Sequence, residues 1–190
     1  LPYTTLFRSV WLMGIWERSP VGRKFFQTDP ASFPSFDAAL PGWKLSQVVG
    51  SPYSIFRYRP DPRIGSWADL DFVRKKLRAR HIGLILDFVA NHTAPDHPWT
   101  MSHPEYYVRG SQEDFRKNPS DFYLLETETE PNLLAQGRDP YFPPWRDVVQ
   151  LNHFELPARA ALIAELRAVA KHCDGVRCDM RSEEHTSELQ

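Results

Sequence analysis

Three short apolar runs, separated by helical patterns, limit the folds open to this chain. They span residues 10–16 (VWLMGIW), 82–89 (IGLILDFV) and 175–180 (GVRCDM). Runs of this length are typical of strands that are buried on both faces of a sheet. Because a helical pattern precedes the second run and another precedes the third, the order predicts an α/β fold with a parallel sheet of right-handed βαβ units.

Both expected helices carry start signals. Ser66 is followed three residues later by Asp69, which predicts a capping box. Leu70, Val73 and Leu77 fall at helical spacing, and the charge run of Arg74, Lys75, Lys76 and Arg78 is expected to form a solvated face of that helix. Pro157 suits the first turn of the other helix, whose apolar stripe consists of Leu162, Ile163, Leu166, Val169 and Ala170.

Two longer segments lack such patterns. The Pro-, Gly- and Phe-rich residues 17–50 predict a long loop. Residues 93–150 hold many aromatic and turn residues without a long helical pattern, so we expect an irregular insertion there. A segment of that length between regular elements is usually functional.

The two ends differ from the rest of the chain. Residues 1–9 (LPYTTLFRS) and 181–190 (RSEEHTSELQ) resemble translations of common sequencing-adapter oligonucleotides. We exclude both from fold reasoning and expect them to pack against nothing; a genuine polar tail is the alternative for the second. With the true N-terminus missing on this view, the sequence predicts nothing about localisation.

Composition excludes some partners. The formal net charge is −1, so no basic stripe is available for nucleic acid. No apolar run approaches the about 20 residues that span a bilayer, so no membrane partner is expected. Cys173 and Cys178 lie about 16 Å apart if the chain between them is extended, too far for a disulfide. We expect both to be small buried apolar residues.

Charged residues end two of the predicted strands. Arg177 and Asp179 lie two apart and therefore share one face of their strand. Asp87 interrupts the middle run, and Asn91 and His92 follow it. In a barrel, functional residues sit at this carboxyl end of the strands. Taken separately, Asp87 also fits a structural hydrogen-bonding role, and Arg177 with Asp179 a plain ion pair.

A zinc site is the weaker interpretation of the nearby histidines. The spacing of His92, Asp96, His97 and His103 fits no closed zinc pattern. Metal-dependent catalysis is therefore not favoured.

Together these strings resemble the α-amylase superfamily, glycoside hydrolase family 13. DFVANH (87–92) resembles its first signature region and GVRCD (175–179) its second. The resemblance extends over residues 10–180, with the second barrel strand, the connection after it and the end of the inserted domain B matched by residues 10–16, 50–54 with 61–65, and 145–152.

This resemblance implies a partial (β/α)8 TIM barrel, about strands 2 to 4, with an irregular domain-B-like insertion after strand 3. The barrel portions would be 10–92 and 151–180, and the insertion 93–150. Residues 1–9 and 181–190 would be the adapter-like ends.

The resemblance also implies roles for single residues. Asp179 would be the nucleophile, and Arg177 would orient it and lower its pKa. Of the substrate-binding group, His92 would hydrogen-bond the sugar, Tyr53 would stack on it, and Asp87 would support the strand end that carries the arginine.

The implied reaction is retaining hydrolysis of α-glucosidic bonds in oligo- or polysaccharides. It needs a second carboxyl about 5–5.5 Å from the nucleophile. In the family this is a Glu on the fifth barrel strand, beyond this chain; Glu155 and Glu165 precede the fourth strand and do not replace it. The chain alone is therefore expected to be inactive, and the full-length protein to be an enzyme.

Calcium at Asn91 is the cofactor implied, and no organic cofactor is expected. The substrate would be an α-glucan or α-glucoside. A transglycosidase or a sucrose or trehalose isomerase of the same family remains an alternative, as does a non-catalytic carbohydrate-binding relative. Retention of both Arg177 and Asp179 favours an enzyme, because a scaffold does not need that pair.

Overall fold

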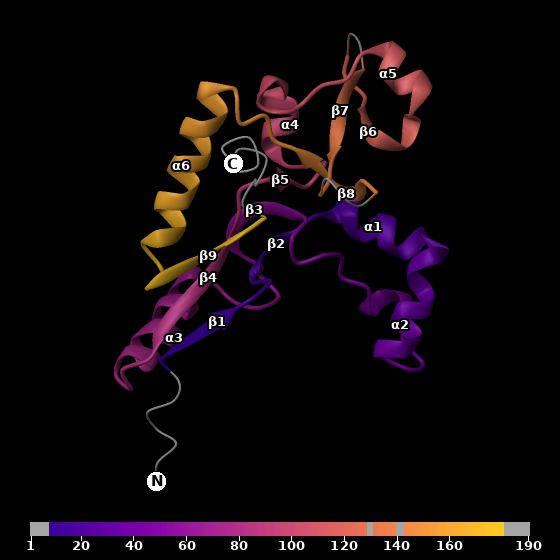
Figure 1. Cartoon of the computed structure of the whole chain (residues 1–190). Coiled ribbons are helices and arrows are strands. Elements are labelled where there is room, and N and C mark those ends of the chain that lie inside the picture. Colours follow the sequence, from indigo (N-terminus) through magenta and orange to yellow (C-terminus); the bar gives the residue numbers. More distant parts are fainter. Residues whose placement is uncertain (1–7, 129–130, 140–142, 181–190) are drawn as a thin grey trace, which may run out of the picture.

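The computed structural model describes residues 8–128, 131–139 and 143–180 (Figure 1). Its strands are β1 Ser9–Leu12, β2 Trp16–Arg18, β3 Ile55–Pro60, β4 Gly83–Val89, β5 His92–Thr93, β6 Phe122–Leu125, β7 Asn132–Gly137, β8 Trp145–Gln150 and β9 Gly175–Asp179. Its α-helices are α1 Pro20–Thr28, α2 Phe33–Ala39, α3 Trp67–Arg78, α4 Pro98–Ser102, α5 Gln112–Lys117 and α6 Leu156–Ala170. The 3-10 turns are η2 Pro30–Ser32, η3 Leu45–Gln47, η4 Pro104–Tyr106 and η5 Pro119–Asp121.

A parallel sheet in the order β1-β4-β9 confirms the predicted α/β alternation. Helix α3 precedes β4, and α6 precedes β9. Leu84 and Leu86, two residues apart, point to the same face of β4 and join a core that includes Leu70 of α3 and Val169 of α6. Both helices therefore pack on the same strand, but the predicted stripe of α6 is only partly buried: Leu162 and Val169 are buried, whereas Ile163 is 48% exposed and Ala170 is also exposed.

The first predicted strand is wrong in extent and in burial. The run 10–16 divides into β1 and β2, and β2 pairs antiparallel with β3 instead of joining the parallel sheet. The division falls at Gly14, which has φ +72°; a Cβ there would lie 2.8 Å from Pro52 Cβ. Trp11 is 44% exposed because β1 is an edge strand, not a strand covered on both faces.

The packing expected of the N-terminal segment also needs correction. Ser9 pairs with Gly83 in the parallel sheet, and the Gly83 amide donates to the Arg8 carbonyl at 2.8 Å. The expectation that residues 1–9 pack against nothing is therefore wrong for these two. Residues 1–7 and 181–190 lie outside the described residues.

Residues 17–50 contain two helices, so the prediction of a long loop is wrong. Ser19 caps α1: its Oγ accepts from the Gly22 amide at 2.7 Å, and Pro20 follows at the first turn. Asp96 adds to this end by accepting from the Val21 amide at 3.1 Å. The Ser-Pro start signal was present in the sequence.

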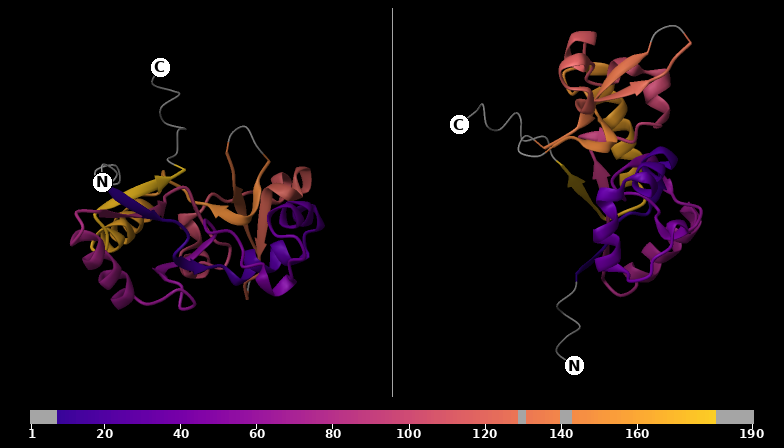
Figure 2. Two further views of the ribbon diagram at one scale, coloured as in Figure 1. Left: turned by 90° about the horizontal axis from the view of Figure 1, so that it is seen from below. Right: turned by 90° about the vertical axis from the view of Figure 1, so that its right-hand side faces the viewer.

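Residues 93–150 are more regular than predicted. Four antiparallel strands in the order β5-β8-β7-β6 form a second sheet, and short helices and turns lie between β5 and β6 along the chain. Leu134 and Val149 are fully buried there. The sheet lies beyond the carboxyl end of β4, and α1 lies beside β8 (Figure 2).

The capping box of α3 is confirmed, whereas its charged face is only partly solvated. The Ser66 Oγ accepts from the Asp69 amide, and the Asp69 carboxylate accepts from the Ser66 amide. Arg74 and Arg78, however, both bind Asp174 at the turn before β9. These ion pairs join α3 to the loop that leads into the third strand of the sheet.

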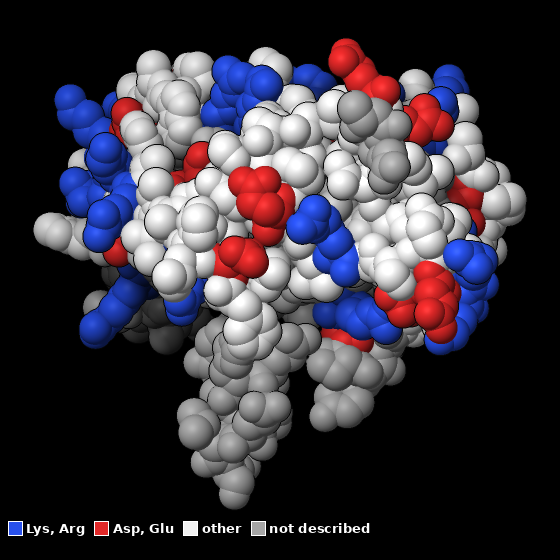
Figure 3. All heavy atoms as spheres, turned by 90° about the horizontal axis from the view of Figure 1, so that it is seen from above, with Lys and Arg blue, Asp and Glu red and all other residues white. Residues whose placement is uncertain are grey.

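Surface features complete the description. Both cysteines are free, as predicted, but Cys178 is exposed, so its expected burial is wrong. Basic and acidic side chains are interspersed on the face in Figure 3. Among the described residues, no helix has the length and apolarity needed to cross a membrane.

Candidate active site

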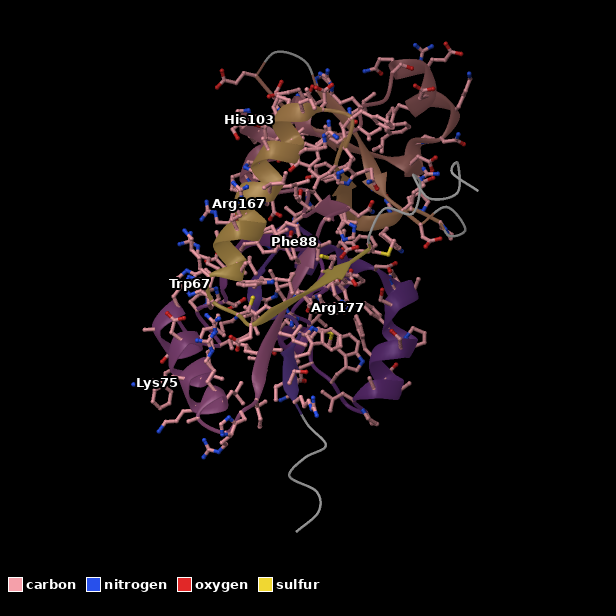
Figure 4. All side chains as sticks on the ribbon, turned by 60° about the vertical axis from the view of Figure 1, so that its left-hand side comes forward. Trp67, Lys75, Phe88, His103, Arg167 and Arg177 are labelled. Carbon is pink, nitrogen blue, oxygen red and sulfur yellow. The ribbon has the colours of Figure 1, made fainter. Side chains whose placement is uncertain are left out.

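Arg177 joins two carboxylates at the carboxyl end of the parallel sheet. The register pairs Asp87 with Arg177 and Val89 with Asp179 across β4 and β9. Nη1 of Arg177 lies 2.9 Å from Oδ1 of Asp87, and Nη2 lies 2.6 Å from Oδ1 of Asp179. In Figure 4, Arg177 lies on the side of β9 away from α6. The prediction that Arg177 and Asp179 share one face of their strand is confirmed by this contact.

Two aromatic side chains hold this end of β4 where β1 no longer pairs with it. The last pair with β1 is Leu12 with Leu86. Beyond it, Trp16 Nε1 donates to the Asp87 carbonyl at 2.9 Å. Tyr58 Oη donates to the Val89 carbonyl at 3.0 Å and accepts from the Val89 amide at 2.8 Å. These bonds satisfy backbone groups that the missing strand neighbour would leave unpaired.

Arg177 also lies over two aromatic rings. Its guanidinium carbon is 4.7 Å from the Trp11 ring centroid and 5.7 Å from that of Tyr53. Tyr53 Oη accepts from Arg177 Nη1 at 3.5 Å and donates to Met13 Sδ at 3.1 Å. A cation over a ring face is favourable, so the two rings help to fix the guanidinium.

The pKa values of Arg177 and Asp179 depend on both their ion pairs and their burial. The Asp87 hydrogen bond raises the pKa of Arg177, which stays charged. Burial raises the pKa of Asp179, and the Arg177 charge opposes that shift without cancelling it. Arg177 therefore acts on the pKa of Asp179 in the predicted direction, but burial has the larger effect.

A cavity of about 350 Å³ opens over these strand ends. Asp179, Tyr53 and His92 line it, whereas Asp87, Asn91 and Arg177 do not belong to its lining. His92 is 4% exposed, and burial lowers its pKa to about 4, so the ring is neutral at pH 7. The cavity thus combines a carboxylate, a neutral imidazole and an aromatic ring.

Known proteins with similar sequence or fold give this arrangement its context. No family model matches the chain. It is 30% identical over 117 residues, 62% of its length, to "Alpha-amylase MalA" of Haloarcula japonica, of which it covers 15%. A crystal structure of an α-amylase from Lactobacillus plantarum shares its fold, with a TM-score of 0.58 and 23% identity over 90% of the chain and 30% of that structure.

These similarities in sequence and in fold support a fragment of an α-amylase-family catalytic domain. The isomaltulose synthase from Erwinia rhapontici NX5 also has this fold, with a TM-score of 0.61 and 17% identity over 93% of the chain and 28% of that structure. These neighbours support a partial (β/α)8 barrel. The chain spans less than a third of the length of each of these three relatives.

Proteins of the α-amylase family often bind calcium, but the described residues do not fit it at Asn91. Gln150 engages the whole Asn91 carboxamide: its Nε2 donates to Asn91 Oδ1 at 2.9 Å, and its Oε1 accepts from Asn91 Nδ2 at 3.2 Å. Calcium takes six to eight oxygen ligands. Within the described residues, no group of three or more His, Cys, Asp or Glu side chains could hold a metal ion.

The histidines of the rejected zinc site have other partners. His97 Nδ1 accepts from the Trp99 amide at 3.1 Å, and His103 pairs with Glu105 at 3.0 Å. Asp96 accepts from Ser19 Oγ at 2.6 Å, at the start of α1. These contacts are structural.

Several residues that line the cavity were not predicted from the sequence. Asp147, on β8, is 7% exposed, and burial raises its pKa to about 6. Its burial within the second sheet was not visible, although a lone Asp in an apolar string was a signal. The other missed residues are Phe26, Ser51, Trp145, Val148 and Met180.

Proposed function

We propose that the full-length protein containing this segment is a retaining glycosidase that acts on α-glucosidic bonds of oligo- or polysaccharides. The observation that carries this proposal is the Arg177 bridge between Asp87 and Asp179, beside a cavity that Asp179 lines. A glycosidase nucleophile must be a carboxylate that is held in one orientation beside the sugar.

The first step is attack by Asp179 at the anomeric carbon. Arg177 binds Oδ1 of Asp179 and so fixes the carboxylate plane; we assign the attack to Oδ2. A carbon–oxygen bond to the sugar forms, and the glycosidic bond breaks as a general acid protonates the leaving oxygen. Water then hydrolyses the glycosyl ester. We assign the general acid to a part of the family's domain beyond this segment.

The remaining residues bind or position. His92, neutral and lining the cavity, donates or accepts a hydrogen bond with a sugar hydroxyl, and Tyr53 packs on the sugar face. Asp87 holds Arg177. Asp147, protonated in part near pH 6, hydrogen-bonds a second hydroxyl. We assign Asn91 a structural role in its amide pair with Gln150. No step of the proposed reaction depends on a metal.

The correspondence with the family's architecture is part of the proposal. We assign β1, β4 and β9 to barrel strands 2, 3 and 4. Residues 10–92 and 151–180 then belong to the barrel, and residues 93–150 to the inserted domain B. The parallel register of the three strands supports this order.

A transglycosidase or an isomerase is the second candidate. The fold shared with the isomaltulose synthase of Erwinia rhapontici supports it. The same glycosyl ester would pass to a sugar hydroxyl instead of water. Chromatography of the products formed from maltose and from sucrose separates the candidates, since hydrolysis alone gives no new disaccharide.

Asp179→Asn in the full-length protein tests the nucleophile. An amide cannot form the glycosyl ester, so turnover of an α-glucoside should fall by on the order of 10³-fold or more. Cys178→Ser, one residue away on the other face of β9, is the matched control and should keep its activity. Parental turnover in Asp179→Asn, with intact folding, would falsify the proposal and favour a non-catalytic, carbohydrate-binding relative.

A further inference from the structure

A second cavity, of about 310 Å³, lies next to the one at Asp179. Two residues, Phe26 of α1 and Ser51, line both cavities. The walls of the second come from α1, α2 and the segment around η3, the region predicted to be a loop. The residues that line it are Phe26, Phe36, Ala39, Leu40, Trp43, Gln47, Val48, Val49, Gly50 and Ser51.

Aromatic rings form one wall of this second cavity. The Trp43 ring lies edge-on to Phe36 at 5.2 Å and also packs on Phe33 at 5.3 Å between centroids. Trp43 Nε1 donates to Asp37 at 2.8 Å, which fixes the indole. Trp43 and Phe36 are only partly buried, so ring surface remains open to a ligand.

Several acceptor oxygens along the wall are already engaged within the protein. Gln47 Oε1 accepts from the Lys44 amide at 2.7 Å, and Ser51 Oγ accepts from the Tyr53 amide at 3.2 Å. The Val48 carbonyl accepts from Arg23 Nε at 3.0 Å. A sugar placed here would bury hydroxyls with few partners, which is unfavourable. A planar apolar group suits the cavity better.

We propose that this second cavity binds the aromatic aglycone of an α-glucoside whose sugar lies in the first cavity. The inference rests on the proposed function and adds the substrate class: a glucoside of a phenol-like alcohol. The two cavities share the wall residues Phe26 and Ser51 and therefore adjoin, and we place one molecule across both, from the carboxylate of Asp179 to the ring of Trp43.

Kinetics of the full-length protein test the proposal with two substrates, 2-naphthyl α-glucoside and maltose. Loss of an aromatic contact changes affinity by about tenfold. Trp43→Ala should therefore lower the ratio of kcat/KM for the naphthyl glucoside to that for maltose by about tenfold. Leu45→Ala, an exposed neighbour outside the lining, should leave the ratio unchanged.

A second variant guards against misfolding of Trp43→Ala. Ala39→Phe, at the exposed end of α2, fills the cavity and should lower the same ratio. Direct titration of the parent with 2-naphthol should give binding that both variants lose. An unchanged ratio and unchanged naphthol binding in folded variants would overturn the proposal.

These outcomes separate the two levels of inference. If the parent turns over neither glucoside but binds 2-naphthol through Trp43, the proposed function fails and the apolar site stands without its catalytic partner. If the parent turns over both substrates with equal preference in every variant, the glycosidase stands and the aglycone site fails.

Discussion

The two sheets of this chain divide the candidate site between them in different ways. The parallel sheet contributes the charged groups of the site. Arg177 of β9 binds both Asp87 of the adjacent strand β4 and Asp179 of its own strand. The antiparallel sheet forms part of the cavity wall, because Trp145 and Asp147 of β8 line the cavity. The first group depends on register within one sheet, whereas the second depends on how the antiparallel sheet packs over the first.

This difference indicates which part of the site is held most firmly. The carboxyl end of β4 is held by Trp16 and Tyr58 as well as by its strand neighbour. The antiparallel sheet shares one hydrophobic core with the parallel sheet, in which Leu134 and Val149 lie together with Leu86. Two buried polar contacts add to this packing: Ser54 Oγ, just before β3, donates to the Asp147 carbonyl at 2.6 Å, and Asn91 pairs with Gln150. We therefore expect changes in the parallel sheet to affect chemistry, and changes in the antiparallel sheet to affect the cavity's shape.

The largest effect is expected from Arg177→Met in the full-length protein. Its loss leaves Asp87, 2% exposed, and Asp179 without the cation that joins them. Turnover should fall by on the order of 10²–10³-fold, because the carboxylate is no longer oriented. The free energy of unfolding should fall by about 2 kcal/mol, less than for a fully buried pair since Arg177 is partly exposed. Steady-state kinetics and urea unfolding measure the two.

Arg177→Lys sharpens this test. Lysine keeps the charge but cannot bind two carboxylates as a planar fork does. It should recover most of the stability and little of the turnover. Equal recovery of both would mean that charge, not orientation, is what Arg177 contributes.

Leu134→Ala should produce the next largest effect, in the antiparallel sheet. Leu134 is fully buried, so the substitution leaves a cavity and should cost about 3 kcal/mol. Hydrogen exchange should accelerate in β6, β7 and β8 more than in β4. Leu124→Ala, at an exposed position on β6, is the control and should change stability by less than about 0.5 kcal/mol. Equal acceleration in both sheets would show that they unfold as one unit.

The parallel sheet was predictable because its signals are local. Each of its strands is a short apolar run, and Arg177 and Asp179 share a face by alternation alone. The α3 start was visible as Ser66 with Asp69. The split at Gly14 was missed, although a glycine within an apolar run often marks a bend.

The antiparallel sheet could not be predicted in the same way. Its strands pair across long separations: His92 of β5 pairs with Gln150 of β8. Single residues such as Asp147 carry no periodic signal, and their burial exists only once the sheets pack. The α1 helix was missed for a different reason. Its start signal, Ser19 followed by Pro20, was present in the sequence but was not used.

Asp147→Asn is expected to have a smaller, pH-dependent effect. The folded-state pKa of Asp147 is raised to about 6 from 3.8 by burial. Well below pH 3.8 the carboxyl is protonated in both states, so burial costs no charge; as pH rises from 3.8 through 6 the unfolded state ionises first and this stability is lost. The variant should therefore gain stability over the parent across this range, by about 3 kcal/mol at neutral pH. Thermal unfolding at several pH values measures this difference.

Glu113→Gln is the matched control for that pH series, because Glu113 is an exposed carboxylate on α5. Its stability should follow the parent's at each pH. An Asp147→Asn curve that also follows the parent would mean that Asp147 is hydrated in the full-length protein, and its proposed hydrogen bond to a sugar hydroxyl would lose its support.

The smallest effect compares one capping box in each region. Ser66 with Asp69 caps α3, and Ser111 with Asp114 caps α5, through the same pair of bonds. Helix α3 packs Leu70 into the parallel sheet's core, whereas α5 has no buried residue. Ser66→Ala should therefore lower the free energy of global unfolding by about 1 kcal/mol. Ser111→Ala should leave global unfolding unchanged and only raise hydrogen exchange within α5, because a helix that buries nothing can open alone. If both substitutions lower global stability equally, α5 is coupled to the core and does not open alone.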